Sequence, residues 1–386
     1  MFLIESFICH KINKLININT KKDIKMKKTK NIQKIKYKIW IITTLFFSII
    51  AFIIFASVTI YIDPLFHYHK PLNKYKYPIN NERYQNDGIT RNFEYESIIT
   101  GTSMTENFKK SEADKIFESD FIKVPFSGGY YKEINDNLKR AYSSGKNIKY
   151  IIRCLDYSYL VEYKDAYRED ISYPFYLYNN NLFDDMNYVF NKSILFEQTR
   201  SVIKHTKTEI KTTNFDDYAN WNNYYTFGAE TVLSTYTLDE TASTAQVFSE
   251  DERSMVLGNI RQNVTSLAAA HPETTFYYFF PPYSICYWDI LKNDGQIDWR
   301  IDAEQAAIEE ILKYPNIKLY SFCNNFELVC NLDNYKDQAH YGEWVNSWIL
   351  EWMHNDEYLL TKDNYKKYIK TIREFYNSYD YALLHK

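Results

Sequence analysis

One uncharged segment near the N-terminus constrains this chain more than any other feature. Residues 39–62 read IWIITTLFFSIIAFIIFASVTIYI and contain no Asp, Glu, Lys or Arg. A bilayer core needs roughly 20 apolar residues in an α-helix, so the segment is long enough to span a membrane. A cleaved signal peptide has a shorter apolar core, of about 7–15 residues, followed by small residues. The residues that follow here, around Asp63-Pro64, form a poor cleavage site. We therefore expect an uncleaved transmembrane helix.

The charges on either side of this segment predict its orientation. Nine lysines and a single acid lie between Lys21 and Lys38. This lysine run disfavours a buried core helix, and the positive-inside rule places it in the cytoplasm. Residues 1–38 are then a basic cytoplasmic tail, and the part after residue 62 lies outside the cell, bound to the membrane by a single pass. Met26-Lys-Lys-Thr-Lys is a natural beginning for such a tail, so translation from Met26 is an alternative to Met1.

The rest of the chain is acidic. Of 46 basic and 49 acidic residues, 11 lysines and two acids lie in residues 1–62, which leaves 35 basic and 47 acidic residues for residues 63–386. Nucleic-acid binding requires a positively charged face. The composition therefore argues against a nucleic-acid partner.

Cysteine and histidine spacing gives little reason to expect a metal. No cysteine pair has the spacing to histidines that a structural zinc site uses, so we expect no metal and no cofactor. Cys154 and Cys286 lie in apolar runs and are expected as buried thiols. Cys323 and Cys330 are separated by six residues. They could form a disulfide outside the cell or remain two unpaired thiols, and the sequence does not decide between these alternatives.

Apolar runs alternate with helical patterns after residue 92. Residues 63–92 are polar and aromatic without a period and are interpreted as a linker or cap. From residue 93 to 386 we expect one doubly wound α/β domain with a parallel sheet, because runs of this length alternating with helices indicate βαβ units. Residues 157–240 lack a clear period and are interpreted as an insertion with short helices. The expected strands are 95–100, 121–126, 147–155, 275–280 and 317–322, and the main expected helices are 104–117, 250–270, 302–314 and 342–354.

Three short segments lie where such a sheet binds its ligands, beyond the carboxyl ends of the strands. Ser103 follows the first strand in Gly-Thr-Ser and opens a helix, although a serine there can simply cap the helix. Gly128 and Gly129 follow the second strand, where glycines let a backbone amide approach a substrate closely, or merely form a turn. Asp337-Gln-Ala-His340 follows the fifth strand, and a carboxylate three residues away can orient the imidazole. The alternative for His340 is an exposed histidine near a helix start.

In combination these segments resemble the SGNH (GDSL-like) hydrolase superfamily. The likeness is strongest to membrane-anchored members such as the teichoic-acid D-alanylation protein DltD and alginate O-acetylation proteins. It covers roughly residues 93–355, together with the anchor and the Asp-Pro-Leu-Phe-His-Tyr-His run after it. The resemblance implies a flavodoxin-like three-layer α/β/α sandwich. It also implies Ser103 as nucleophile, His340 as general base, Asp337 as the group that orients His340, and an oxyanion hole formed by amides of Ser103 and Gly128 or Gly129.

The sequence departs from the family pattern in two places. Thr102 stands where the common first block has Asp, as in the acyl-transferring membrane members. The third block usually supplies an asparagine to the oxyanion hole, but the third strand here is followed by Asp156. An ionised Asp156 cannot donate a hydrogen bond, so a structural role is favoured over a protonated carboxyl or a substrate-binding role.

The resemblance implies acyl chemistry on a polymer of the cell envelope. Ser103 would carry an acyl group to or from a hydroxyl of a polysaccharide or teichoic acid. A polytopic membrane acyltransferase of the MBOAT family would be the partner that supplies the acyl group, as in the related systems. A non-catalytic binding module that keeps the fold and a plain extracellular carbohydrate esterase are the alternatives.

Overall fold

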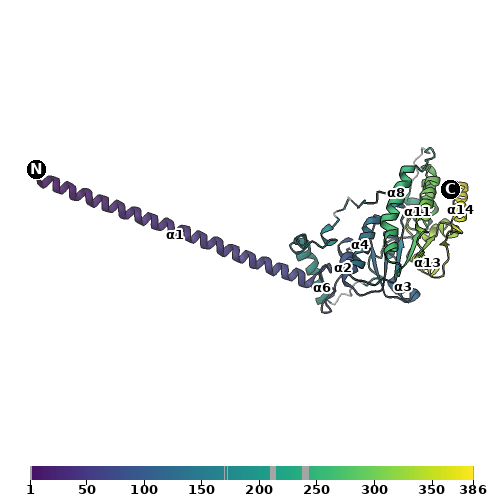
Figure 1. Ribbon diagram of the computed structural model, residues 1–386, viewed down its shortest axis with the longest axis horizontal. Helices are drawn as coiled ribbons and strands as arrows, with labels where there is room; N and C mark the ends of the chain where they lie inside the picture. Colours follow the sequence, from purple (N-terminus) through teal and green to yellow (C-terminus); the bar gives the residue numbers. More distant parts are fainter. Residues whose placement is uncertain (1, 169, 172, 209–213, 237–242, 386) are drawn as a thin grey trace. The chain divides into compact units, whose positions relative to one another are not determined.

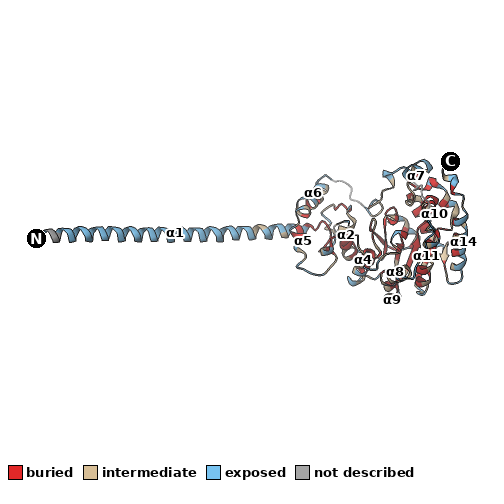
Figure 2. Ribbon diagram, turned by 90° about the horizontal axis from the view of Figure 1, so that it is seen from above, coloured by how far each residue is buried: buried red, intermediate tan, exposed pale blue. Residues whose placement is uncertain are grey.

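The computed structural model describes residues 2–168, 170–171, 173–208, 214–236 and 243–385, and it divides into two compact units, Met1–Tyr61 and Ile62–Lys386. The first unit is helix α1 (Phe2–Ile62). Within the described residues, one helical segment, Phe7–Ile62, is long and apolar enough to cross a membrane by length and composition. None of its most apolar window is buried, and α1 is exposed along most of its length in Figure 2, with Thr59 and Ile62 buried at its end. These properties are compatible with a single-pass anchor or a signal sequence.

The second unit is an α/β domain built on a six-stranded sheet of order β2-β1-β3-β4-β5-β6. The first five strands are parallel, and β6 pairs with β5 in the antiparallel direction. Their sequences are nearly continuous apolar runs because both faces of a parallel sheet are covered. The strands are β1 (Ser97–Gly101), β2 (Phe121–Pro125), β3 (Tyr150–Cys154), β4 (Thr275–Phe280), β5 (Ile317–Ser321) and β6 (Leu359–Leu360).

Helices cover both faces of this sheet, as Figure 1 shows. Across the sheet, β2 lies on one side of β1, and β3, β4 and β5 follow in order on the other side. Because parallel strands are joined by right-handed crossovers, α3 lies on one face of the sheet and α4, α8, α9 and α11 lie on the opposite face. Contacts agree, because α3 touches α13, whereas α8 touches α11 and α11 touches α14. The α-helices of the second unit outside the segment between β3 and α8 are α2 (Glu82–Asn92), α3 (Lys110–Phe117), α4 (Tyr131–Ser143), α8 (Glu250–Ile260), α9 (Ser266–Ala270), α10 (Ile285–Asn293), α11 (Ile297–Ile311), α12 (Phe326–Cys330), α13 (Glu343–His354) and α14 (Tyr365–Ser378).

Among its described residues, the segment between β3 and α8 forms short helical elements and no strand. Residues 209–213 and 237–242, which the insertion and its end include, lie outside the described residues. The described elements are η2 (Tyr157–Tyr159), η3 (Phe175–Leu177), α5 (Met186–Val189), η4 (Ile194–Gln198), α6 (Thr199–Lys207), η5 (Asn222–Tyr224) and α7 (Ala229–Thr235).

Residues 63–92 differ from the expected linker or cap, because their last third forms α2. The helix packs against α4 and β2. Most of its buried positions are polar and form hydrogen bonds, with Ile89 as the one buried large apolar side chain, so no apolar period marks the helix in the sequence. Asn86 Nδ2 donates to the Pro125 carbonyl, Asn86 Oδ1 accepts from Tyr218 at 2.7 Å, and Asp87 accepts from Arg140 at 2.7 Å.

The cysteines are all free thiols, so Cys323 and Cys330 are not bridged. Cys323 is buried in the core, and its Sγ lies 2.8 Å from the Tyr157 hydroxyl. Burial raises the pKa of the Cys323 thiol to about 12, which makes it a poor nucleophile at neutral pH.

Candidate active site

Ser103 stands at the carboxyl end of β1, where the strand order reverses. β1 lies between β2 and β3, and a turn of 3₁₀-helix, η1 (Ser103–Thr105), begins directly after it. The turn requires Gly101, whose φ of +149° favours glycine and whose Cα hydrogen faces the Thr105 side chain; a Cβ there would meet Thr105 Cγ2 at 2.6 Å. Ser103 is partly exposed, so its hydroxyl is open to a substrate.

The imidazole of His340 lies between Ser103 and Asp337. Ser103 Oγ is 2.8 Å from Nε2, and Nδ1 is 3.0 and 2.9 Å from the two Asp337 oxygens. An ionised carboxylate only accepts hydrogen bonds, so Nδ1 carries the proton and Nε2 is left to accept from the serine hydroxyl. The structure thus brings together three residues of which two are 237 positions apart in the chain.

Asp337 is held in place by the backbone of its own loop. Its Oδ1 accepts from the amides of Ala339 and His340 at 2.9 and 2.8 Å, and its Oδ2 lies 3.2 Å from Lys336 Nζ. Burial raises the pKa of this carboxyl, but the hydrogen bonds from the His340 ring and from the two amides outweigh burial and hold the pKa well below its usual value. Asp337 therefore stays ionised and fixes the orientation and tautomer of His340.

Asp156 lies after β3 and supports the turn before Ser103 instead of facing a substrate. Its Oδ2 accepts from the Thr102 hydroxyl at 2.6 Å, and its Oδ1 accepts from the Tyr283 hydroxyl at 2.7 Å and the Ser158 amide at 2.9 Å. Both carboxyl oxygens are engaged and the residue is 4% exposed. Asp156 thus accepts hydrogen bonds through both carboxyl oxygens, and the contact with Thr102 joins β3 to the turn before Ser103.

The two glycines after β2 are not equivalent. The Gly129 amide donates to the Phe126 carbonyl at 2.7 Å, so it is engaged within the turn. The backbone amides of Gly128 and Ser103 donate no hydrogen bond to any described residue. Gly128 has φ of +57°, and a Cβ there would lie 2.0 Å from Arg168 Nη1. The available amide of the expected pair is therefore that of Gly128.

The turn that carries Gly128 is fastened by residues that the sequence did not single out. Glu82, at the start of α2, accepts from the Ser127 amide, and Arg168 Nη1 donates to the Ser127 carbonyl at 3.2 Å. Burial raises the pKa of the Glu82 carboxyl well above its usual value, and the nearby Glu106 adds to the shift. No local sequence signal marks these residues, because both contacts join segments that are far apart in the chain.

The insertion supplies an aromatic residue that covers the histidine. The Trp221 ring lies edge-on to His340 at a centroid distance of 5.7 Å, and its amide donates to Asn107 Oδ1 at 3.0 Å. Lys336 lies over the rings of Trp221 and Tyr225, with Nζ 4.7 and 3.9 Å from their centroids. This cation–π contact places a positive charge beside the Asp337–His340 pair.

A cavity of about 730 Å³ opens on the Asp337 side of the imidazole. Lys336, Asp337 and Gln338 form one wall, and the insertion forms the other. Ser103 and His340 do not line it. Its insertion wall consists mainly of hydroxyl-bearing residues: Tyr224, Tyr225, Thr226, Thr231, Ser234 and Thr235, with Glu230.

Comparisons with known proteins add little to this geometry. No family model matches the chain, and no curated protein matches it. Among solved structures, the chain is similar to one described as "a putative platelet activating factor from Streptococcus pneumonia". The two share 10% sequence identity, the match covers 71% of this chain and 90% of the other, and the TM-score is 0.37. At that TM-score the likeness supports no inference about activity, so the candidate site rests on its own contacts.

Proposed function

We propose that this chain is a membrane-anchored serine enzyme that transfers or hydrolyses acyl groups of a cell-envelope polysaccharide or teichoic acid. The observation that carries the proposal is the Ser103–His340–Asp337 relay, with 2.8 Å between Ser103 Oγ and His340 Nε2 and a carboxylate on the other ring nitrogen. A structural serine cap needs neither the histidine nor its carboxylate. The relay is the arrangement that general-base activation of a serine requires.

The reaction begins when Ser103 Oγ attacks the carbonyl carbon of an ester. The Oγ proton moves to His340 Nε2 as the new O–C bond forms, and Asp337 stabilises the imidazolium. The bond from the carbonyl carbon to the leaving oxygen then breaks, and His340 returns the proton to that oxygen. The acyl-Ser103 is released by the reverse sequence, with water or a polymer hydroxyl as the attacking group. Water gives an esterase and a polymer hydroxyl gives an acyltransferase.

The oxyanion of the tetrahedral intermediate is stabilised by backbone amides. Within the described residues, the backbone amides of Ser103 and Gly128 donate no hydrogen bond. An oxyanion hole requires such free amides before the substrate binds. Asp156, which stands where the family has its asparagine, accepts from Thr102 and Tyr283 and adds no donor to these two amides. We expect the rate acceleration to rest on two donors.

The N-terminal part of the chain supports a location at the cell envelope, whereas the polymer substrate and the membrane partner rest on the resemblance to the membrane-anchored SGNH proteins. An uncharged 24-residue segment after nine lysines favours a helix with its lysine-rich end in the cytoplasm and the second unit outside. That location gives the site access to envelope polymers, and a polytopic MBOAT-type acyltransferase would deliver the acyl group across the membrane. A cysteine placed at Lys74 should react with an impermeant maleimide from outside intact cells; reaction only after lysis would rule out this topology.

An acyl-enzyme assay tests the function. The full chain in lipid nanodiscs is mixed with p-nitrophenyl acetate, and both p-nitrophenol release and intact mass are followed. We expect a burst of p-nitrophenol and an acetyl group on Ser103, with both lost in Ser103→Ala. Tyr163→Ala, a change at a 72% exposed side chain, is the control and should behave as the wild type. Absence of both burst and adduct in a folded wild-type chain would replace the enzyme by the binding-module alternative.

A further inference from the structure

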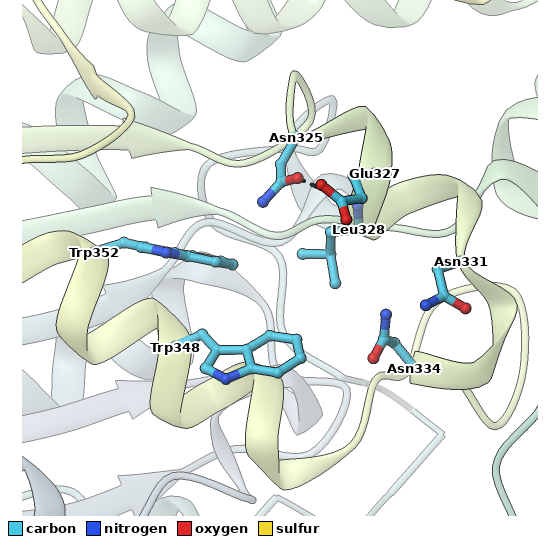
Figure 3. A pocket seen from close by; sticks show the side chains of 7 residues that line it. All are labelled: Asn325, Glu327, Leu328, Asn331, Asn334, Trp348 and Trp352. Atoms are coloured by element: carbon cyan, nitrogen blue, oxygen red, sulfur yellow. Dashed lines mark hydrogen bonds between the residues drawn. The ribbon is translucent and has the colours of Figure 1, made fainter.

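A second pocket, with a volume of about 400 Å³, is lined by residues of α12, of the turns on either side of α12, and of α13. Figure 3 shows Trp348 and Trp352 on one side of an open space, with Leu328 beside them and Asn331 and Asn334 across from Trp348. Trp348 is 39% exposed, which is unusual for so large an apolar side chain. The two indoles are 6.2 Å apart and tilted by 44°.

The asparagines of this pocket have fixed orientations. Asn325 Oδ1 accepts from the Leu328 amide at 3.2 Å, Asn331 Oδ1 accepts from the Asp333 amide at 3.1 Å, and Asn334 Oδ1 accepts from Trp344 Nε1 at 2.9 Å. Each amide therefore has its oxygen engaged inside the protein. No hydrogen bond from any of the three NH₂ groups is found among the described residues, so each can donate to a ligand.

The fourth polar group is a carboxylate. Glu327 is exposed and lines the pocket, and no lysine or arginine is among the described residues that line it. The pocket thus combines aromatic faces, three amide donors and one strong acceptor. A pyranose ring satisfies all of these, because its C–H face covers an indole while its hydroxyls both accept from amides and donate to a carboxylate. The uncompensated negative charge of Glu327 disfavours a uronic acid or a phosphodiester.

Aromatic side chains connect this pocket to the candidate active site. Trp344, Trp348 and Trp352 are spaced by four residues on α13, so they follow one face of the helix over about 12 Å. Trp344 contacts Phe227 at a centroid distance of 4.9 Å, and Phe227 stacks on Trp221, which covers His340. A line of half-buried aromatic rings thus extends from α13, which carries the pocket's two tryptophans, to the ring that covers His340.

We propose that the pocket formed by Trp348, Trp352 and the asparagines around Glu327 binds a neutral or amino-sugar unit of a saccharide chain. Its biological role as a polymer-holding subsite rests on the proposed function, whereas the binding itself does not require Ser103. The site would retain the polymer between acyl-transfer events and favour saccharides without negative charge.

The test uses the full chain in lipid nanodiscs, free of sugar-based detergents, and measures affinity by calorimetry for three probes. These are chitopentaose, which is neutral, the glucosamine pentamer, which is cationic, and pentagalacturonate, which is anionic. We expect one of the first two to bind, and Trp348→Ala to weaken that binding at least about tenfold, which corresponds to ~1.4 kcal/mol. Asn331→Ala should weaken it severalfold, and Trp348→Phe should retain most of it.

Tyr163→Ala and Ser103→Ala serve as controls and should leave the affinity unchanged. Ser103→Ala distinguishes this proposal from the catalytic one. If the variant loses acylation but binds the saccharide as before, Ser103 is needed for the reaction and not for binding in this pocket. The proposal is overturned if neither the neutral nor the cationic probe binds the wild type, if Trp348→Ala binds as tightly as the wild type, or if pentagalacturonate binds most tightly. Thermal unfolding of each variant identifies misfolding, and if Trp348→Ala is misfolded, Asn331→Ala decides.

Discussion

Removing the Asp156 carboxylate should destabilise the second unit and disorder the turn that carries Ser103. Asp156→Ala deletes the acceptor for two buried hydroxyls, those of Thr102, which is 0% exposed, and Tyr283, which is 3% exposed. A buried donor left without a partner costs about 1–3 kcal/mol, so the two together cost about 2–6 kcal/mol. That is a large fraction of the 5–15 kcal/mol by which a folded domain is typically stable.

Urea unfolding of the nanodisc-bound chain, followed by near-UV circular dichroism, measures this loss. With a slope of about 3 kcal/mol/M, the midpoint should fall by about 0.7–2 M. Thr102→Val removes the hydroxyl's hydrogen bond to Asp156 and the long one that it accepts from the Met104 amide, and should cost about 1 kcal/mol. The double variant should cost less than the sum, because Thr102 is no longer orphaned.

Asp363→Ala is the matched control, since Asp363 is exposed and should change stability by less than about 0.5 kcal/mol. An unfolding midpoint of Asp156→Ala equal to that of Asp363→Ala would refute the assignment of Asp156 as the support of the Ser103 turn. It would also reopen a substrate-facing role for this carboxylate.

Three other changes test separate features. Gly128→Ala places a Cβ 2.0 Å from Arg168 Nη1 and should slow acylation of Ser103 at least tenfold. Gly145→Ala is the control and should leave the rate unchanged, because Gly145 also has a positive φ but has nothing within 4 Å of its Cβ. Equal acylation rates in the two variants would show that the Gly128 turn takes no part in the reaction. Burial lowers the pKa of Lys123 to about 7, so the unfolded state binds this proton more tightly than the folded state between pH 7 and 10. The free energy of unfolding should therefore rise with pH over that window, by ~1.4 kcal/mol for each unit of pKa difference, and Lys123→Met should flatten the rise; a parallel pH dependence in both proteins would contradict the assignment. Titration of the denatured, unreduced chain with a thiol reagent should find five thiols, whereas a count of three would mean a disulfide that the structure does not contain.

The sheet could be predicted because its strands are buried on both faces. Runs such as residues 275–280 and 317–322 coincide with β4 and β5 to within a residue, since an uninterrupted apolar run between turn residues has few alternatives in an α/β pattern. The location of Ser103 and the Asp337–His340 pair followed from the same reasoning. Both segments come after parallel strands, and the carboxyl ends of those strands meet at one edge.

Other features depend on tertiary contacts that no local pattern records. α2 buries Gln85, Asn86 and Asp87 through hydrogen bonds, so it lacks the apolar period by which a buried helix is recognised. β6 has only two residues and exists because it pairs with β5. The packing of Trp221 on His340 joins an aperiodic insertion to a distant loop. The hydrogen bond from Thr102 to Asp156 likewise joins two segments that are far apart in the sequence.

Covalent labelling with a fluorophosphonate tests the central claim, that His340 activates Ser103. The probe phosphonylates a serine whose proton is removed by a base, with loss of fluoride, and requires no knowledge of the natural substrate. Intact mass spectrometry and peptide mapping of the wild-type chain should show one adduct, on Ser103. Ser103→Ala should carry none, and His340→Ala should react at least 100-fold more slowly, because general-base assistance typically contributes 10²–10⁴ in rate. Labelling of Ser103 at the same rate in His340→Ala, or no labelling of a folded wild-type chain, would contradict the account.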